Sequence, residues 1–150
     1  DPDWHNQLCR HSRYTQGGHV MDTKLVMIID DSIVVRKILE VAMKRAGIPY
    51  VSYPDGTDAM RALAARQDLV PDLVFLDIGM PKMSGYRVAQ LLRGRKRFSK
   101  TVIVILSGRT GVLDRLKGRL AGAQSYLTKP FTTQDIETIV QTYLPSAPFL

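Results

Sequence analysis

Five polar residues stand where short, mostly apolar runs end, as buried strands would. They are Asp30, Asp31, Asp77, Ser107 and Lys129. At a separation of about 5 Å and an effective dielectric constant of roughly 20, two carboxylates repel each other by about 3 kcal/mol. A bound cation would offset the repulsion among the three aspartates, and oxygen-only ligands suit Mg²⁺. These residue types therefore indicate a magnesium site.

The same residue types could transfer a phosphoryl group. Beside a divalent cation, one carboxylate can act as the nucleophile toward phosphorus and form an aspartyl phosphate. Catalysis of this reaction is mostly positioning and charge stabilisation, for which Lys129 and a hydroxyl donor such as Ser107 are suited. Helix capping or a surface location would explain any one of the five residues, but does not easily explain all five together.

The apolar runs alternate with segments of helical periodicity. The predicted strands are 25–29, 50–53, 73–76, 101–106 and 125–128. The predicted helices run from an N-cap at Ser32 to Gly47, follow Pro54-Asp55-Gly56, and cover 86–93, 112–120 and 132–143. This alternation predicts an α/β fold with a doubly wound, five-stranded parallel sheet and helices on both faces. Ligands bind outside the carboxyl ends of such strands, which is where the five polar residues fall.

Length and composition fit a single domain. The chain has 150 residues, of which 45% are hydrophobic and 23% are charged. We expect the domain at 24–145, after a flexible extension at 1–23 that is an upstream linker or an expression-derived segment, and before a tail at 146–150. No run approaches the length of a membrane helix, and the single cysteine, Cys9, cannot form an internal disulfide. These features predict a cytoplasmic protein without membrane contact.

The formal net charge of +7 raises the question of an acidic partner. No Asp or Glu lies between Asp77 and Asp114. The cations of that stretch are Lys82, Arg87, Arg93, Arg95, Lys96, Arg97, Lys100 and Arg109. Because the stretch lacks the aromatic interleaving typical of proteins that bind single-stranded nucleic acid, we do not expect nucleic acid binding from this chain alone.

Four motifs make the chain resemble the receiver domains of two-component response regulators, of the chemotaxis-regulator kind, from residue 24 to about 144. They are Ile29-Asp30-Asp31-Ser32, the segment from Leu76 to Gly85, Leu106-Ser107-Gly108 and Thr128-Lys129-Pro130-Phe131. The second follows the family's phosphoacceptor pattern of Asp, two residues, Met-Pro and a later Gly. The resemblance implies a flavodoxin-like sheet with the strand order 2-1-3-4-5.

The resemblance also implies the ligands of the cation. Asp77 would be the phosphoacceptor. Mg²⁺ would be held by Asp31, Asp77 and the backbone carbonyl of Gly79, with Asp30 acting largely through water.

Further roles are implied at the other strand ends. Lys129 would pair with the phosphoryl group, and its peptide bond to Pro130 would be cis. Ser107 would move to hydrogen-bond a phosphoryl oxygen. Tyr126 matches an aromatic position whose rotamer reports activation in the family, although a half-buried core side chain explains it as well.

By the same resemblance the chain is a signalling switch and not an enzyme, although it would catalyse its own phosphotransfer and dephosphorylation. The phosphoryl group would come from a phosphohistidine of a sensor histidine kinase or of a histidine phosphotransfer protein. A basic face between Gly108 and Tyr126 would bind a downstream protein, or the output would come from a domain absent from this sequence.

Three alternatives remain. A haloacid-dehalogenase phosphatase also uses an aspartate nucleophile, but that nucleophile follows the first strand and a second aspartate comes two residues later, whereas Asp30 and Asp31 are adjacent. A flavodoxin-like electron carrier would need a phosphate-binding loop rich in Ser, Thr and Gly after the first strand. An inactive receiver would share the fold and act by binding alone.

Overall fold

The secondary structure follows the predicted alternation, in a computed structural model that describes residues 24–108 and 111–145. The strands are β1 (Val26–Ile29), β2 (Tyr50–Tyr53), β3 (Leu73–Asp77), β4 (Val102–Ser107) and β5 (Ser125–Thr128). The helices are α2 (Ile33–Arg45), α3 (Gly56–Ala65), α4 (Gly85–Arg93), α5 (Val112–Leu120) and α6 (Thr133–Tyr143), with the short 3-10 helix η1 (Lys96–Phe98). These bounds agree closely with those predicted.

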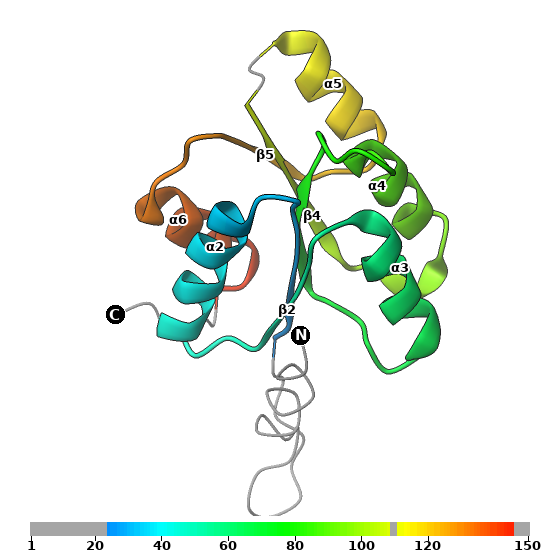
Figure 1. The fold of residues 1–150 in the computed structure, drawn as a ribbon, viewed down its shortest axis with the longest axis horizontal. Coiled ribbons are helices and arrows are strands. Elements are labelled where there is room, and N and C mark those ends of the chain that lie inside the picture. Colours follow the sequence, from blue (N-terminus) through cyan, green and yellow to red (C-terminus); the bar gives the residue numbers. More distant parts are fainter. Residues whose placement is uncertain (1–23, 109–110, 146–150) are drawn as a thin grey trace, which may run out of the picture.

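All five strands form one parallel sheet in the order β2-β1-β3-β4-β5. Figure 1 shows α2 and α6 on one side of this sheet and α3 and α4 on the other. The predicted fold class and strand order are therefore confirmed. Because the strands are parallel, their carboxyl ends share one edge of the sheet, and the loops at that edge can bring distant residues together.

The sheet is covered on both faces, so β1 and β3 at its centre are buried along their whole length. Successive side chains of β1 point to opposite faces. Met27 and Ile29 belong to the core cluster on the face of α3 and α4, whereas Val26 and Ile28 belong to the cluster on the face of α2 and α6. The domain thus has two hydrophobic cores, one on each side of the sheet.

Helix α2 buries a narrower stripe than its apolar periodicity suggested. Its buried residues are Leu39, Ala42 and Met43. Val34 and Ile38 share the same periodic pattern but are 67% and 41% exposed. The sheet and α6 cover only part of the apolar arc of this helix, and the remaining apolar side chains near its amino end face solvent.

Most of the helices begin at a side-chain cap. The capping side chains are Ser32 for α2, Asp55 for α3, Ser84 for α4 and Thr132 for α6. The predicted cap Ser32 is confirmed, because its hydroxyl accepts a hydrogen bond from the backbone N–H of Val35 at 3.3 Å. At α6 a capping box is complete, with Thr132 and Asp135 each accepting from the other's backbone N–H.

Helix α5 differs from the others at several points. It follows Gly111, which supplies no side-chain cap. Three of its leucines face solvent: Leu113, Leu116 and Leu120 are 77%, 49% and 78% exposed. Its inner side includes Gly118, where an added Cβ would lie 3.6 Å from the Tyr126 ring. α5 is therefore attached to the sheet by few buried side chains.

The carboxyl end of α5 is held from α4 by Arg93. This guanidinium donates from Nε to the carbonyl of Gly122 at 2.9 Å, and from Nη1 to that of Phe98 at 3.1 Å. Its Nη2 donates to the carbonyl of Thr101 at 2.7 Å. Gly122 has a φ of +100°, and a Cβ there would lie 2.4 Å from Cγ of Arg93. Glycine is therefore required at this turn.

None of the helices within 24–108 and 111–145 combines the length and the apolar character that a membrane span requires. The predicted extension at 1–23, with Cys9, and the predicted tail at 146–150 lie outside the described residues. The domain bounds therefore stay a prediction.

Candidate functional site

Three carboxylates meet at the carboxyl edge of the sheet. Asp30 and Asp31 directly follow β1, and Asp77 ends the neighbouring strand β3. Ile29 pairs with Leu76 across these strands, so that Asp30 and Asp77 both lie one residue beyond a paired position. One oxygen from each of the three carboxylates lies within 4.8 Å of the others. The predicted convergence of these residues is thus a feature of the structure.

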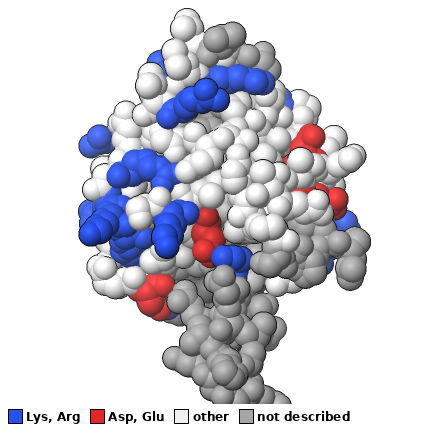
Figure 2. Space-filling model, turned by 180° about the vertical axis from the view of Figure 1, so that it is seen from behind, with Lys and Arg blue, Asp and Glu red and all other residues white. Residues whose placement is uncertain are grey.

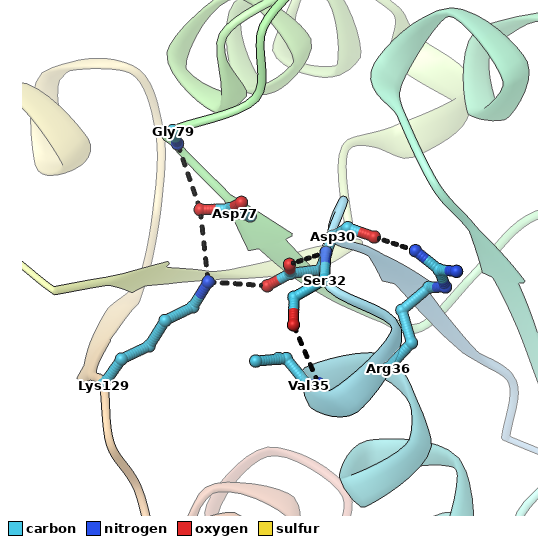
Figure 3. A network of polar contacts seen from close by, with 7 residues as sticks. All are labelled: Asp30, Ser32, Val35, Arg36, Asp77, Gly79 and Lys129. Carbon is cyan, nitrogen blue, oxygen red and sulfur yellow. Dashed lines mark hydrogen bonds and ion pairs between the residues drawn. The ribbon is translucent and has the colours of Figure 1, made fainter.

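Asp30 is the most enclosed of the three, with no exposed surface. Its Oδ1 accepts a hydrogen bond from the backbone N–H of Ser32 at 2.8 Å. Its Oδ2 lies 2.8 Å from Nζ of Lys129 (Figure 3). Both carboxylate oxygens of Asp30 are therefore engaged inside the protein, whereas Asp31 is exposed to solvent.

Asp77 is buried between these groups. Its Oδ1 accepts from the backbone N–H of Gly79 at 3.0 Å and lies 3.5 Å from Nζ of Lys129. Burial, assisted by the charge of Asp30, raises the pKa of the Asp77 carboxyl above its ordinary value, although the Gly79 hydrogen bond and Lys129 oppose this shift. The carbonyl of Gly79, predicted as a metal ligand, stays a prediction.

Lys129 supplies the positive charge of the cluster. Burial would lower the pKa of its ammonium group, but the hydrogen bond and charge of Asp30, followed by Asp77, outweigh burial and raise that pKa. Lys129 is therefore a cation throughout the physiological range. Its backbone N–H donates to the carbonyl of Ser107 at 2.7 Å, which ties β5 to β4 at this edge. The peptide bond from Lys129 to Pro130 is cis, as predicted.

The two predicted switch residues lie on β4 and β5. Ser107 ends β4 and is buried, in the strand next to Asp77. Tyr126 is half-buried on β5, and the guanidinium carbon of Arg115 lies 5.7 Å from the centre of its ring. Gly118 leaves room beside this ring. Tyr126 thus packs under α5, an arrangement that fits both interpretations of this residue.

The side chains of the site fit a divalent cation. Three carboxylates and one ammonium group give the cluster of Asp30, Asp31, Asp77 and Lys129 a formal charge of −2 (three negative charges and one positive). The atoms that could bind a metal are all carboxylate oxygens, and the exposure of Asp31 leaves one side of the cluster open to water. Hard oxygen ligands of this kind, with room for water, suit Mg²⁺.

Sequence reasoning missed Arg36 on α2. Its Nη1 donates to the main-chain carbonyl of Asp30 at 2.5 Å, directly beside the acidic cluster. The signal in the sequence was weak. A cation one turn into a helix that follows an acidic pair can reach back to that pair, but it can equally well face solvent.

Exposed cations gather on the side of the molecule that carries α4 and α5. Figure 2 shows that Lys and Arg predominate on that half of the face. The exposed cations of α4, η1, α5 and their connections are Lys82, Arg87, Arg95, Lys96, Lys100, Arg115, Lys117 and Arg119. Arg97 is not available to a partner in the same way, because it donates to the carbonyls of Leu63 and Leu69 at 3.0 and 2.7 Å.

Relatives of known family share this sequence pattern. A model of the response regulator receiver domain matches residues 26–141. The chain is 36% identical over 121 residues to Protein PilG of Pseudomonas aeruginosa, which covers 81% of this chain and 87% of PilG. It is 34% identical over 124 residues to the probable transcriptional regulator ycf27 of Cyanophora paradoxa, covering 83% of this chain but only 49% of that longer protein.

Solved structures share the fold. The chemotaxis protein CheY4 of Vibrio cholerae superposes with a TM-score of 0.74 at 25% identity, over 81% of this chain and 98% of CheY4. The receiver domain of the sensor histidine kinase PA1611 of Pseudomonas aeruginosa superposes with a TM-score of 0.72 at 22% identity, over 83% of this chain and 99% of that domain. That structure holds a magnesium ion in its active site cleft.

Proposed function

The chain belongs to the response regulator receiver domain family, and from this premise we propose that Asp77 is its phosphoacceptor. Phosphorylation-dependent switching is the general function of this family. The observation that carries the proposal is how the carboxylates are engaged. Both oxygens of Asp30 have partners, whereas the contacts of Asp77 with Gly79 and Lys129 both fall on Oδ1. We expect Oδ2 of Asp77 to be the attacking oxygen.

In the proposed reaction, Oδ2 of Asp77 attacks the phosphorus of a phosphohistidine. The new O–P bond forms as the P–N bond breaks, and the imidazole leaves with the electron pair of that bond. The ammonium group of Lys129, 3.5 Å from Oδ1 of Asp77, would balance negative charge on the phosphoryl oxygens. The hydroxyl of Ser107 would donate a hydrogen bond to one of them.

Asp30, Asp31 and Asp77 would hold Mg²⁺, with the carbonyl of Gly79 as a further ligand. When bound, the ion supplies positive charge that stabilises the phosphoryl oxygens. The net charge of the cluster and its all-oxygen donors support this assignment. The magnesium ion in the cleft of the PA1611 receiver domain supports it by analogy.

Phosphorylation would change the surface near α5. A phosphoryl group adds about 1.5 to 2 negative charges at the strand edge, so the hydroxyl of Ser107 would be drawn toward it. Tyr126 and α5 would follow this movement. A downstream partner would recognise the region between Gly108 and Tyr126, where Arg115, Lys117 and Arg119 are exposed.

Receiver domains work with sensor histidine kinases and downstream partners. For this chain we propose a histidine kinase or a histidine phosphotransfer protein as the phosphoryl donor, in the cytoplasm. The output would come from a separate protein or from a further domain. We also propose that the chain acts as a switch and not as an enzyme, because the phosphoryl group would remain on its own side chain as the signal.

A phosphorylation-independent receiver is the alternative function. Such a receiver would keep the fold and bind a partner without chemistry. The close approach of three carboxylates to one another favours a receiver that binds a cation and is phosphorylated, because an acidic cluster without a ligand destabilises the folded chain.

Intact-mass spectrometry after incubation with acetyl phosphate tests the proposal. We expect a gain of one phosphoryl mass with Mg²⁺ and none with EDTA. Asp77→Asn should abolish this gain. The matched control is Asp72→Asn, at the opposite end of β3, where the carboxylate accepts from the backbone N–H of Leu25 at 2.8 Å. That variant should be phosphorylated as the wild type is.

Two outcomes would count against the proposal. A phosphoryl adduct that persists in Asp77→Asn would assign the reaction to another residue. If the wild type gains no mass and beryllofluoride leaves its NMR spectrum unchanged, the chain is a receiver that acts by binding alone.

A further inference from the structure

The peptide group between Asp30 and Asp31 has a partner that the chemistry above does not use. Nη1 of Arg36 donates to the main-chain carbonyl oxygen of Asp30 at 2.5 Å. Figure 3 shows the guanidinium on the side of Asp30 that faces away from Lys129. Asp30 is therefore held from two sides, by Lys129 at its carboxylate and by Arg36 at its carbonyl.

This carbonyl lies where the chain leaves the sheet. The pairing of β1 with its neighbours ends at Ile29, although the backbone N–H of Asp30 still donates to the carbonyl of Tyr53 at 3.2 Å. The chain then turns through Ser32 into α2. Asp30 is fully buried, so its carbonyl oxygen needs a hydrogen-bond donor, and Arg36 supplies one.

A hydrogen bond at this atom also constrains the next residue. The six atoms of a peptide group are coplanar, so fixing the carbonyl oxygen of Asp30 fixes the plane that leads to the Cα of Asp31. Asp31 is exposed, and its carboxylate contacts the carboxyl group of Asp77, a like-charged neighbour that repels it when both groups are ionised. The direction of its side chain therefore depends on the orientation of its backbone.

We propose that Arg36 is a positioning residue, which orients the peptide plane between Asp30 and Asp31 and thereby holds the Asp31 carboxylate in place to bind the cation. The inference rests on the proposed cation site. It assigns to the conformation of Asp31 a determinant that lies on α2, outside the acidic cluster.

The charge of Arg36 and its hydrogen bond predict effects of opposite sign. A nearby positive charge repels Mg²⁺, so loss of that charge alone would strengthen metal binding. Loss of the hydrogen bond frees the peptide plane and would weaken metal binding, because the ordering of Asp31 would then have to occur on binding. The direction of the change therefore distinguishes positioning from charge.

The test compares Mg²⁺ affinities, measured by isothermal titration calorimetry, for the wild type, Arg36→Met, Arg36→Lys and Lys37→Met. Lys37 is the matched control, since it is the next residue of α2, is exposed and carries the same charge. We expect Arg36→Met to bind Mg²⁺ about 5- to 10-fold more weakly. Lys37→Met should bind equally or slightly more tightly. Arg36→Lys, which keeps a donor, should recover most of the loss.

Thermal melting in EDTA and NMR complete the test. The backbone amide of Asp31 should shift in Arg36→Met before metal is added, and the melting temperature of Arg36→Lys should match that of the wild type. Equal or tighter Mg²⁺ binding by Arg36→Met overturns the inference. If Arg36→Met does not fold, Arg36→Ala is measured at reduced temperature. Weaker Mg²⁺ binding with a shifted Asp31 amide supports positioning, and an unchanged spectrum and affinity oppose it. Absence of Mg²⁺ binding by the wild type overturns the proposed cation site itself.

Discussion

The helices that precede and follow β5 along the chain, α5 and α6, are held in very different ways. α6 begins with a capping box at Thr132 and Asp135 and buries Ile136 and Val140 completely. α5 begins at Gly111 without a side-chain cap and leaves its leucines in solvent. One neighbour of the edge strand is therefore firmly attached and the other is weakly attached.

This difference separates the residues of the proposed phosphorylation site from the surface that would change on phosphorylation. The acidic cluster stands at the ends of the buried strands β1 and β3, beside the capped amino end of α2, and two of its carboxylates contact Lys129. The exposed leucines and cations stand on α5, where fewer contacts oppose a change of position. Weakly attached elements open at lower free energy than the core does. The rigid half can hold reacting groups in place while the other half changes its surface.

The largest expected effect compares one core position with one surface position. Ile136→Ala removes a fully buried side chain of α6 and should lower the free energy of unfolding by about 2 to 5 kcal/mol. Leu120→Ala, at a residue of α5 that is 78% exposed, should change it by less than about 0.5 kcal/mol. Urea denaturation followed by circular dichroism measures both. Similar losses in the two variants would contradict the contrast between these helices.

Removal of the site's cation should have the next largest effect. Lys129→Met leaves Oδ2 of the fully buried Asp30 without its partner, and should destabilise the protein by about 2 kcal/mol at neutral pH. Because the pKa of Lys129 is raised in the fold, its contribution is complete at neutral pH and is lost only when the pH rises through that higher value. The control Lys100→Met, at an exposed residue, should leave stability unchanged.

Removal of one negative charge should act in the opposite direction. Burial and Asp30 raise the pKa of Asp77, so the fold disfavours its ionised form. In EDTA, Asp77→Asn should therefore raise the free energy of unfolding by about 1 to 2 kcal/mol at neutral pH.

This gain has a defined pH dependence. It should shrink as the pH falls through the raised pKa, and it should vanish below the ordinary value of 3.8, where the carboxyl is protonated in both states. A series of denaturation curves from neutral to acidic pH measures it. A variant less stable than the wild type at neutral pH would contradict the unfavourable ionisation of Asp77 in the acidic cluster.

The smallest effect is expected within α5. Gly118→Ala adds a Cβ at ordinary contact distances of 3.5 Å from Ile105 and 3.6 Å from Tyr126. Alanine favours a helix over glycine by about 1 kcal/mol, so stability should rise by about 0.5 to 1 kcal/mol. Hydrogen exchange of the α5 amides should slow by the factor that corresponds to this gain in free energy. A destabilised variant would indicate that α5 packs more closely on β5 than the contrast between α5 and α6 implies.

The positions of the acidic residues were predictable because strand ends in a parallel sheet follow directly from apolar runs. Asp77 ends the buried run that starts at Leu73, and the parallel pairing places it beside Asp30. The contact of Arg36 was not predictable in the same way. It depends on the rotamer of a long side chain and on the angle at which α2 leaves the sheet, and neither is encoded in periodicity.

The helices were predictable in number and order, but their exposed faces were not. Val34 and Leu39 have similar apolar character, yet one is 67% exposed and the other is buried. On α5, Leu113 and Leu120 are likewise apolar but exposed, at 77% and 78%. Periodicity identifies an apolar stripe, whereas burial depends on how much of that stripe the neighbouring elements reach.

The attachment of Arg93 to Gly122 gives α5 the geometry of a lever. Its carboxyl end is pinned by a hydrogen bond of 2.9 Å, whereas its amino end starts at Gly111 without a side-chain cap and accepts a longer hydrogen bond of 3.2 Å, from the hydroxyl of Tyr86 to the carbonyl of Asp114. A rigid rod held at one end moves most at the other, so a tilt about Gly122 displaces the amino end furthest. That end follows Ser107 in the chain. If Ser107 moves on phosphorylation as proposed, its movement would act at the end of α5 that lies furthest from Gly122.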